Sequence, residues 1–145
     1  MRTIIVDDEF WSIEQFKIEC EKINGVSLIG YFDNPLEALD FCEHNKVELA
    51  LLDIEMPEIN GIELAKRLRE LSPQMVIVFV TAYDNYLSES IKIPADYYLL
   101  KPYTKEDIEK LLNNAWQNEK VCYNRWSWEH MASSKQELKK VEKTW

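Results

Sequence analysis

The strongest constraint on this fold is a repeated change of hydrophobic pattern along residues 1–120. Short, continuous apolar runs alternate with segments in which apolar residues recur every three or four positions. A continuous run is typical of a strand buried on both faces, and the longer period is typical of an amphipathic helix. The pattern predicts five strands, at residues 4–6, 26–32, 47–52, 75–80 and 97–100.

Amphipathic helices are predicted between and after these strands. Apolar stripes define three of them: Ile13, Phe16, Cys20 and Ile23; Gly61, Leu64, Ala65, Leu68 and Leu71; and Ile108, Leu111, Leu112 and Ala115. Asn34 before Pro35 has the form of an N-cap, and Thr104 with Asp107 that of a capping box. The helix at residues 84–92 has few apolar positions and is the weakest of the set. The alternation predicts an α/β protein, with an open parallel sheet covered by helices on both faces.

Polar side chains follow four of the five predicted strands, at the point where each strand ends. Asp7 and Asp8 follow the first, Asp53 the third, Thr81 the fourth and Lys101 the fifth. Because ligand sites in such sheets lie beyond the carboxyl ends of the strands, we expect these groups to converge. Three neighbouring carboxylates repel unless a cation intervenes, and Mg²⁺ suits oxygen ligands. A carboxylate, Mg²⁺, a hydroxyl and an ammonium together meet the needs of phosphoryl transfer.

Five separated motifs carry a resemblance to a known family: Val6-Asp7-Asp8-Glu9, Leu52-Asp53-Ile54-Glu55-Met56-Pro57, Gly61, Thr81-Ala82 and Lys101-Pro102. Together they resemble the receiver domains of two-component response regulators, over about residues 1–118. The resemblance implies a flavodoxin-like, doubly wound five-stranded parallel sheet in the order 2-1-3-4-5. It also implies a phosphoacceptor switch rather than an enzyme, with a sensor histidine kinase as the phosphoryl donor.

The resemblance assigns the acceptor and the metal ligands. Asp53 would be the phosphoacceptor, and Asp8, Asp53 and the backbone carbonyl of Glu55 would bind Mg²⁺. Asp7 would act on the metal mostly through water. His44 and His130 lack ligand-like neighbours, so the donor histidine is expected on another protein.

The resemblance also assigns the residues that respond to the phosphoryl group. Lys101 and Thr81 would each bind one of its oxygens, and Pro102 would follow a cis peptide bond that aims Lys101 inward. Tyr98 would turn inward as Thr81 moves, and the surface near residues 84–116 would change shape. That surface is also where a homodimer could form.

Two positions are expected to tune the lifetime of the phosphoryl group. Glu55 and Tyr83 stand two residues beyond Asp53 and Thr81, where the family obstructs or assists the attacking water. The bulk of Tyr83 favours slow dephosphorylation.

Several of these residues also have plainer interpretations. Asp7, Asp8 and Glu9 alone would suit the solvated start of a helix. Lys101 alone would suit the protein surface, and Tyr98 would suit the core as a half-buried aromatic residue.

Two other classes of protein use the same scaffold. A flavodoxin-like binding module would need a glycine-rich phosphate loop after the first strand, where acids stand instead. A small aspartyl-phosphate hydrolase would need a second carboxylate two residues after its nucleophile. Glu55 occupies that place relative to Asp53, so the hydrolase remains open.

Composition limits the partners. The net charge is −9 and almost all of it lies in residues 1–120, so direct nucleic-acid binding by this domain is not expected. No apolar run is long enough to cross a membrane and no signal peptide is evident, so we expect a cytoplasmic protein without membrane contact. Cys20, Cys42 and Cys122 are widely spaced and are predicted to be reduced packing thiols.

The expected domain covers residues 1–120, and residues 121–145 form a C-terminal tail or linker that is helical in part. Two stretches are similar to the receivers of LytTR-type and SARP-type transcription regulators: Thr81-Ala82-Tyr83-Asp84-Asn85-Tyr86 and Asp96-Tyr97-Tyr98-Leu99-Leu100-Lys101-Pro102. Those regulators carry a DNA-binding or activation domain after the receiver. The chain is therefore expected to be either a stand-alone receiver or a fragment of a longer regulator that controls transcription.

Overall fold

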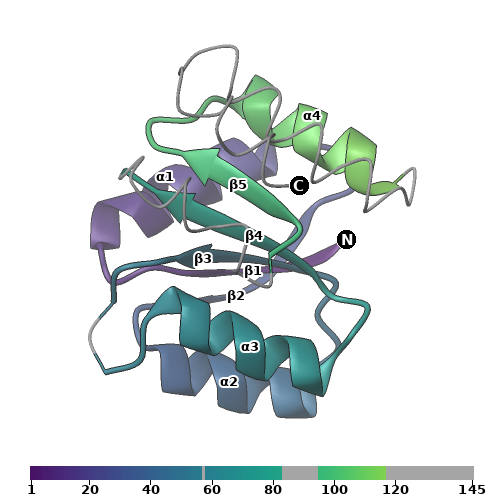
Figure 1. The fold of residues 1–145 in the computed structure, drawn as a ribbon. Coiled ribbons are helices and arrows are strands. Elements are labelled where there is room, and N and C mark those ends of the chain that lie inside the picture. The colour runs from purple at the N-terminus through teal and green to yellow at the C-terminus, as the bar shows by residue number, and fades with distance from the viewer. Residues whose placement is uncertain (57, 83–94, 117–145) are drawn as a thin grey trace, which may run out of the picture.

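A computed structural model describes residues 1–56, 58–82 and 95–116 of the chain (Figure 1). Within these residues, one sheet of five parallel strands has the order β2-β1-β3-β4-β5. The strands are β1 (Arg2–Val6), β2 (Ser27–Phe32), β3 (Leu49–Asp53), β4 (Val76–Thr81) and β5 (Tyr97–Leu100). This order confirms the doubly wound, flavodoxin-like topology.

Helices cover both faces of the sheet. The described residues form α1 (Phe10–Glu21), α2 (Pro35–His44), α3 (Gly61–Leu71) and α4 (Lys105–Trp116). Figure 1 shows α2 and α3 on one face, and α1 and α4 on the other. Each face has its own apolar core, built from the strands and from the helices that cover it. The helix predicted at residues 84–92 lies outside the described residues.

Burial explains why the central strands have continuous apolar sequences. All residues of β3 and β4 are buried, and so are those of β1 after Arg2, because helices cover these strands on both sides. The edge strand β2 is only partly buried along its length. The predicted bounds of β5 are confirmed, those of the other strands differ from the prediction by one or two residues, and β3 extends to include Asp53.

Hydrogen bonds at the helix starts confirm both predicted caps. The side chain of Asn34 accepts hydrogen bonds from the backbone N–H groups of Leu36 and Glu37, at 2.8 and 3.4 Å. Thr104 and Asp107 bond each other reciprocally, each backbone N–H donating to the other's side chain, at 2.9 and 3.2 Å. These caps satisfy N–H groups that have no partner within the helix.

The predicted packing residues are mostly buried. Cys20 and Cys42 are buried free thiols, as expected, whereas Cys122 lies outside the described residues. The prediction for Leu71 was wrong, since this residue is 42% exposed at the end of α3. Leu71 is the last residue of the helix.

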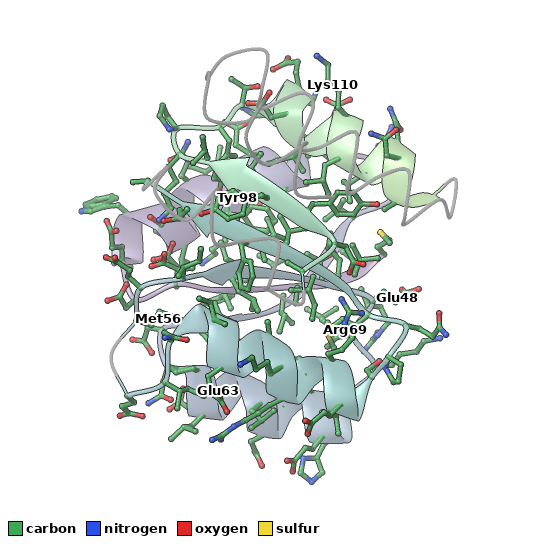
Figure 2. The ribbon with its side chains drawn as sticks, in the orientation of Figure 1. Glu48, Met56, Glu63, Arg69, Tyr98 and Lys110 are labelled. Atoms are coloured by element: carbon green, nitrogen blue, oxygen red, sulfur yellow. The ribbon has the colours of Figure 1, made fainter. Side chains whose placement is uncertain are left out.

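The start of β5 is fixed at the end of the sheet opposite the strand-end acids. Asp96 accepts hydrogen bonds from the backbone N–H of Ile77 and from the Arg69 guanidinium, both at 2.8 Å. Figure 2 shows Arg69 and Glu48 at this end and Met56 at the other. These hydrogen bonds fix the start of the short strand β5 beside β4, and the strand then leads to Lys101.

Candidate functional site

The sheet brings the predicted site residues together at one edge. Asp7 directly follows β1, Asp53 ends β3, Thr81 ends β4 and Lys101 follows β5. The parallel register pairs Asp53 with Val80, and Thr81 with Leu100, so the strands end nearly level. Asp7, Asp53 and Thr81 are 2%, 6% and 1% exposed, so three polar side chains are buried at one place.

Lys101 is held against the acids by direct contacts. Its Nζ atom donates to Asp7 Oδ2 at 2.8 Å and to Ser12 Oγ at 3.0 Å, and it lies 3.9 Å from Glu9 Oε1. Burial lowers the pKa of Lys101, but the hydrogen bond and charge of Asp7 and the charges of Asp53 and Glu9 outweigh this effect and raise its pKa. The side chain therefore stays cationic.

Four carboxylates form a compact cluster. One oxygen from each of Asp7, Asp8, Glu9 and Asp53 lies within 4.8 Å of the others. Burial and the charge of Asp7, with a smaller effect of Asp8, raise the pKa of Asp53 to about 7, although the charge of Lys101 opposes the rise. Without a further cation, Asp53 is therefore only partly ionised near neutral pH.

The cluster has the chemistry of a site for a hard divalent cation. Its donors are carboxylate oxygens, which Mg²⁺ prefers. Asp7 and Asp53 are buried, while Asp8 and Glu9 are exposed, so the cluster opens to solvent on one side. A cation there would offset the repulsion that raises the pKa of Asp53.

Two residues of the site had no predicted role. Glu9 belongs to the acidic cluster, although the sequence pointed to it only as the last residue of the first motif. Ser12 contacts Lys101 from α1, and no spacing rule links a serine in this helix to a lysine after the last strand.

The loop after β3 packs tightly on the backbone of Asp53. A Cβ atom on Gly61 would lie 2.1 Å from the carbonyl oxygen of Asp53, so no side chain fits there. The Gly61 N–H donates to the carbonyl of Ile54 at 2.8 Å. Glu55, within the same loop, has an exposed side chain.

The peptide bond between Lys101 and Pro102 is cis. The backbone N–H of Lys101 donates to the carbonyl of Thr81 at 2.8 Å, which continues the pairing of β5 with β4 up to the site.

Tyr98 lies in the core between the sheet and its helices. The side chain is 3% exposed, and its ring meets that of Phe79 edge to face at 6.4 Å between centroids. Figure 2 shows Tyr98 on β5. Tyr98 is thus buried, more completely than the half-buried position considered from sequence. Tyr83 lies outside the described residues.

Comparison with known proteins shows the family. The chain matches the model of the response regulator receiver domain over residues 3–113. It therefore belongs to the receiver domains of response regulators, which confirms the recognition made from the five motifs. Membership favours the switch over the hydrolase and the flavodoxin-like binding module.

Individual relatives agree with this assignment. The chain is 32% identical over 124 residues to the transcriptional regulatory protein YpdB of Escherichia coli K12, covering 83% of this chain and 51% of YpdB. It is 34% identical over 112 residues to the sensory transduction protein LytT of Bacillus anthracis, covering 77% of this chain and 46% of LytT. The chain thus spans about half the length of these curated relatives.

A solved structure shows the same fold. The response regulatory domain of protein mrkE from Klebsiella pneumoniae matches this chain with a TM-score of 0.72 and 33% identity, covering 82% of this chain and all of that one.

Among the described residues, no helix has the length and hydrophobicity required to cross a membrane.

Proposed function

We propose that this receiver domain accepts a phosphoryl group on Asp53. The observation that carries the proposal is that this carboxylate is buried within reach of the charges of Asp7, Asp8 and Lys101. A carboxylate oxygen of Asp53 attacks phosphorus, the new O–P bond forms, and the P–N bond to the donor's histidine breaks. The donor histidine belongs to a sensor histidine kinase.

The acids would hold Mg²⁺ during this reaction. Asp8, Asp53 and the backbone carbonyl of Glu55 would bind the ion, and Asp7 would bind it mostly through water. The ion supplies positive charge to the phosphoryl oxygens. Ionisation of Asp53 is needed for the attack, and a nearby cation favours it by lowering a pKa that burial has raised to about 7.

Lys101 and Thr81 would recognise the phosphoryl group once it is attached. Each would donate to one of its oxygens, and both stand at the same edge of the sheet as Asp53. The new charge draws these donors toward the acceptor, and Tyr98 follows the movement of Thr81. The surface near residues 84–116 would change as a result, and a partner that prefers one shape would read the signal.

Glu55 and Tyr83 would set the lifetime of the phosphoryl group, because they would control the rate of dephosphorylation.

We assign residues 1–120 to the receiver and residues 121–145 to a tail or linker. Because YpdB is a transcriptional regulatory protein, the output would be control of transcription by another domain or protein.

Intact-mass spectrometry with acetyl phosphate and Mg²⁺ tests the phosphoacceptor. The protein should gain about 80 Da, the mass of one added phosphoryl group. Chelation of Mg²⁺, or the substitution Asp53→Asn, should abolish the gain. Asp40→Asn, an exposed acid on α2, is the matched control and should keep it.

Two results would contradict the proposal: no gain in the wild-type protein, or an equal gain in Asp53→Asn. Sustained turnover of a small phosphate ester would instead support the hydrolase.

A further inference from the structure

Lys101 has a contact that none of the roles above explains. Its ammonium group offers three protons, and one of them goes to the hydroxyl of Ser12 at 3.0 Å. Ser12 is a partly buried residue near the start of α1. The Lys101 contact therefore joins the helix after β1 to the end of β5.

Two carboxylates, one buried and one exposed, lie beside the same ammonium. Asp7 is buried and accepts a hydrogen bond at 2.8 Å, whereas Glu9 is 69% exposed and lies 3.9 Å away, beyond hydrogen-bond distance. Both carboxylates attract the ammonium, so without a further contact Asp7 alone would oppose its displacement toward Glu9. Within the described residues, the Ser12 hydroxyl is the neutral acceptor on this lysine.

A neutral acceptor suits a cation that must later move. Hydrogen bonds from an ammonium to carboxylates are stronger than those to hydroxyls, so the Ser12 contact restrains Lys101 without competing strongly with an incoming phosphoryl group.

We propose that Ser12 is a positioning residue that keeps the Lys101 ammonium on the buried side of the acidic cluster, away from Glu9. The inference rests on the proposed phosphorylation of Asp53. Ser12 and Glu9 then act in opposition: the hydroxyl holds the ammonium where the phosphoryl group arrives, and the exposed carboxylate draws it away.

Phosphorylation kinetics with acetyl phosphate at saturating Mg²⁺ test the opposition. Ser12→Ala should lower the maximal rate by about fivefold, the effect of losing one hydrogen bond. Half-saturation by Mg²⁺ should change less than about twofold, because Ser12 offers no ligand to the metal. Ser12→Thr keeps the hydroxyl and should retain the wild-type rate.

The double variant Ser12→Ala/Glu9→Gln supplies the specific readout. Removing the competing charge should restore the maximal rate to within about twofold of the Glu9→Gln variant alone, as expected for coupled residues. Equal rates in wild type and Ser12→Ala would overturn the proposal. So would a loss in Ser12→Ala that Glu9→Gln does not restore.

The resting protein separates this proposal from the proposed function. The ¹⁵N resonance of the Lys101 ammonium should shift in Ser12→Ala and stay unchanged in Ser27→Ala, an exposed serine at the start of β2. An unchanged Lys101 resonance in Ser12→Ala would overturn the Ser12 assignment even if Asp53 is phosphorylated. If the Lys101 resonance shifts in Ser12→Ala but the wild-type protein is not phosphorylated, the proposed phosphoacceptor is wrong and the Ser12 assignment stands.

Discussion

At the scale of residues, the side chains that would report phosphorylation are buried. Thr81 is 1% exposed at the end of β4, and Tyr98 is 3% exposed on the neighbouring strand. Any movement of Thr81 must therefore be compensated by a neighbour, since protein interiors leave few voids. Tyr98 packs against Phe79, two residues before Thr81, and is placed to make that adjustment.

A phosphoryl analogue tests this coupling. Adding beryllofluoride and Mg²⁺ should shift the backbone amide resonances of Thr81, Tyr98 and Lys101, because new acceptors draw the hydroxyl and the ammonium. Resonances at the far end of the sheet, such as that of Ser27, serve as the control and should stay in place. Unchanged amide spectra over residues 81–103 would refute the switch.

The residues of the site differ in how far the sequence could predict them. Asp7, Asp53, Thr81 and Lys101 directly adjoin strand ends, and parallel strands bring their carboxyl ends to one edge. Ser12 lies in a helix, so its direction depends on how α1 packs against the sheet. No local pattern records that packing.

At the scale of elements, the β3–α3 connection has little tolerance for change. Gly61 approaches Asp53 so closely that an added Cβ would lie 2.1 Å from a backbone oxygen, which cannot rotate away. Gly61→Ala should therefore lower the free energy of unfolding by about 2 to 3 kcal/mol, the cost of overpacking. It should also slow phosphorylation, because relief of the clash displaces Asp53.

Gly30→Ala is the matched control for this prediction. An added Cβ at Gly30 would meet the ring of Phe32 at 2.8 Å, and a side chain can shift where a backbone cannot. Urea unfolding of both variants measures the difference. An equal or smaller loss in Gly61→Ala would show that the loop can adapt.

The elements themselves could largely be predicted from sequence. Continuous apolar runs identified β1, β3 and β4 because helices bury both faces of these strands. Exact boundaries could not be predicted, since they depend on neighbouring strands. Leu71 shows the same limit, because periodicity alone does not say which residues at the end of a helix are covered by neighbours.

At the scale of the whole molecule, two apolar cores support an edge where charge is concentrated. The cores bury the central strands on both faces and so fix where each strand ends. The cost is that four carboxylates share a small space at that edge. Folding must therefore work against their repulsion unless protons or a cation offset it.

The sign of this effect follows from the pKa of Asp53, which burial raises to about 7 from an ordinary value of 3.8. The stabilising contribution of its protonated form is complete below the ordinary value and is lost as pH rises through about 7. Without metal, the charged Asp53 should cost on the order of 2 to 4 kcal/mol at about pH 8. Asp53→Asn should remove that cost.

Urea unfolding at about pH 8, with and without Mg²⁺, measures the free energy of unfolding and so tests whether the acidic cluster binds a cation. Mg²⁺ should stabilise the wild-type protein by about 1 kcal/mol or more, as expected for a ligand that binds only the folded state. Asp53→Asn should be more stable than wild type without Mg²⁺ and gain less from it, while Glu70→Gln, an exposed acid on α3, should behave as wild type. A wild-type protein that gains nothing from Mg²⁺, with an Asp53→Asn variant no more stable than wild type, would contradict the account.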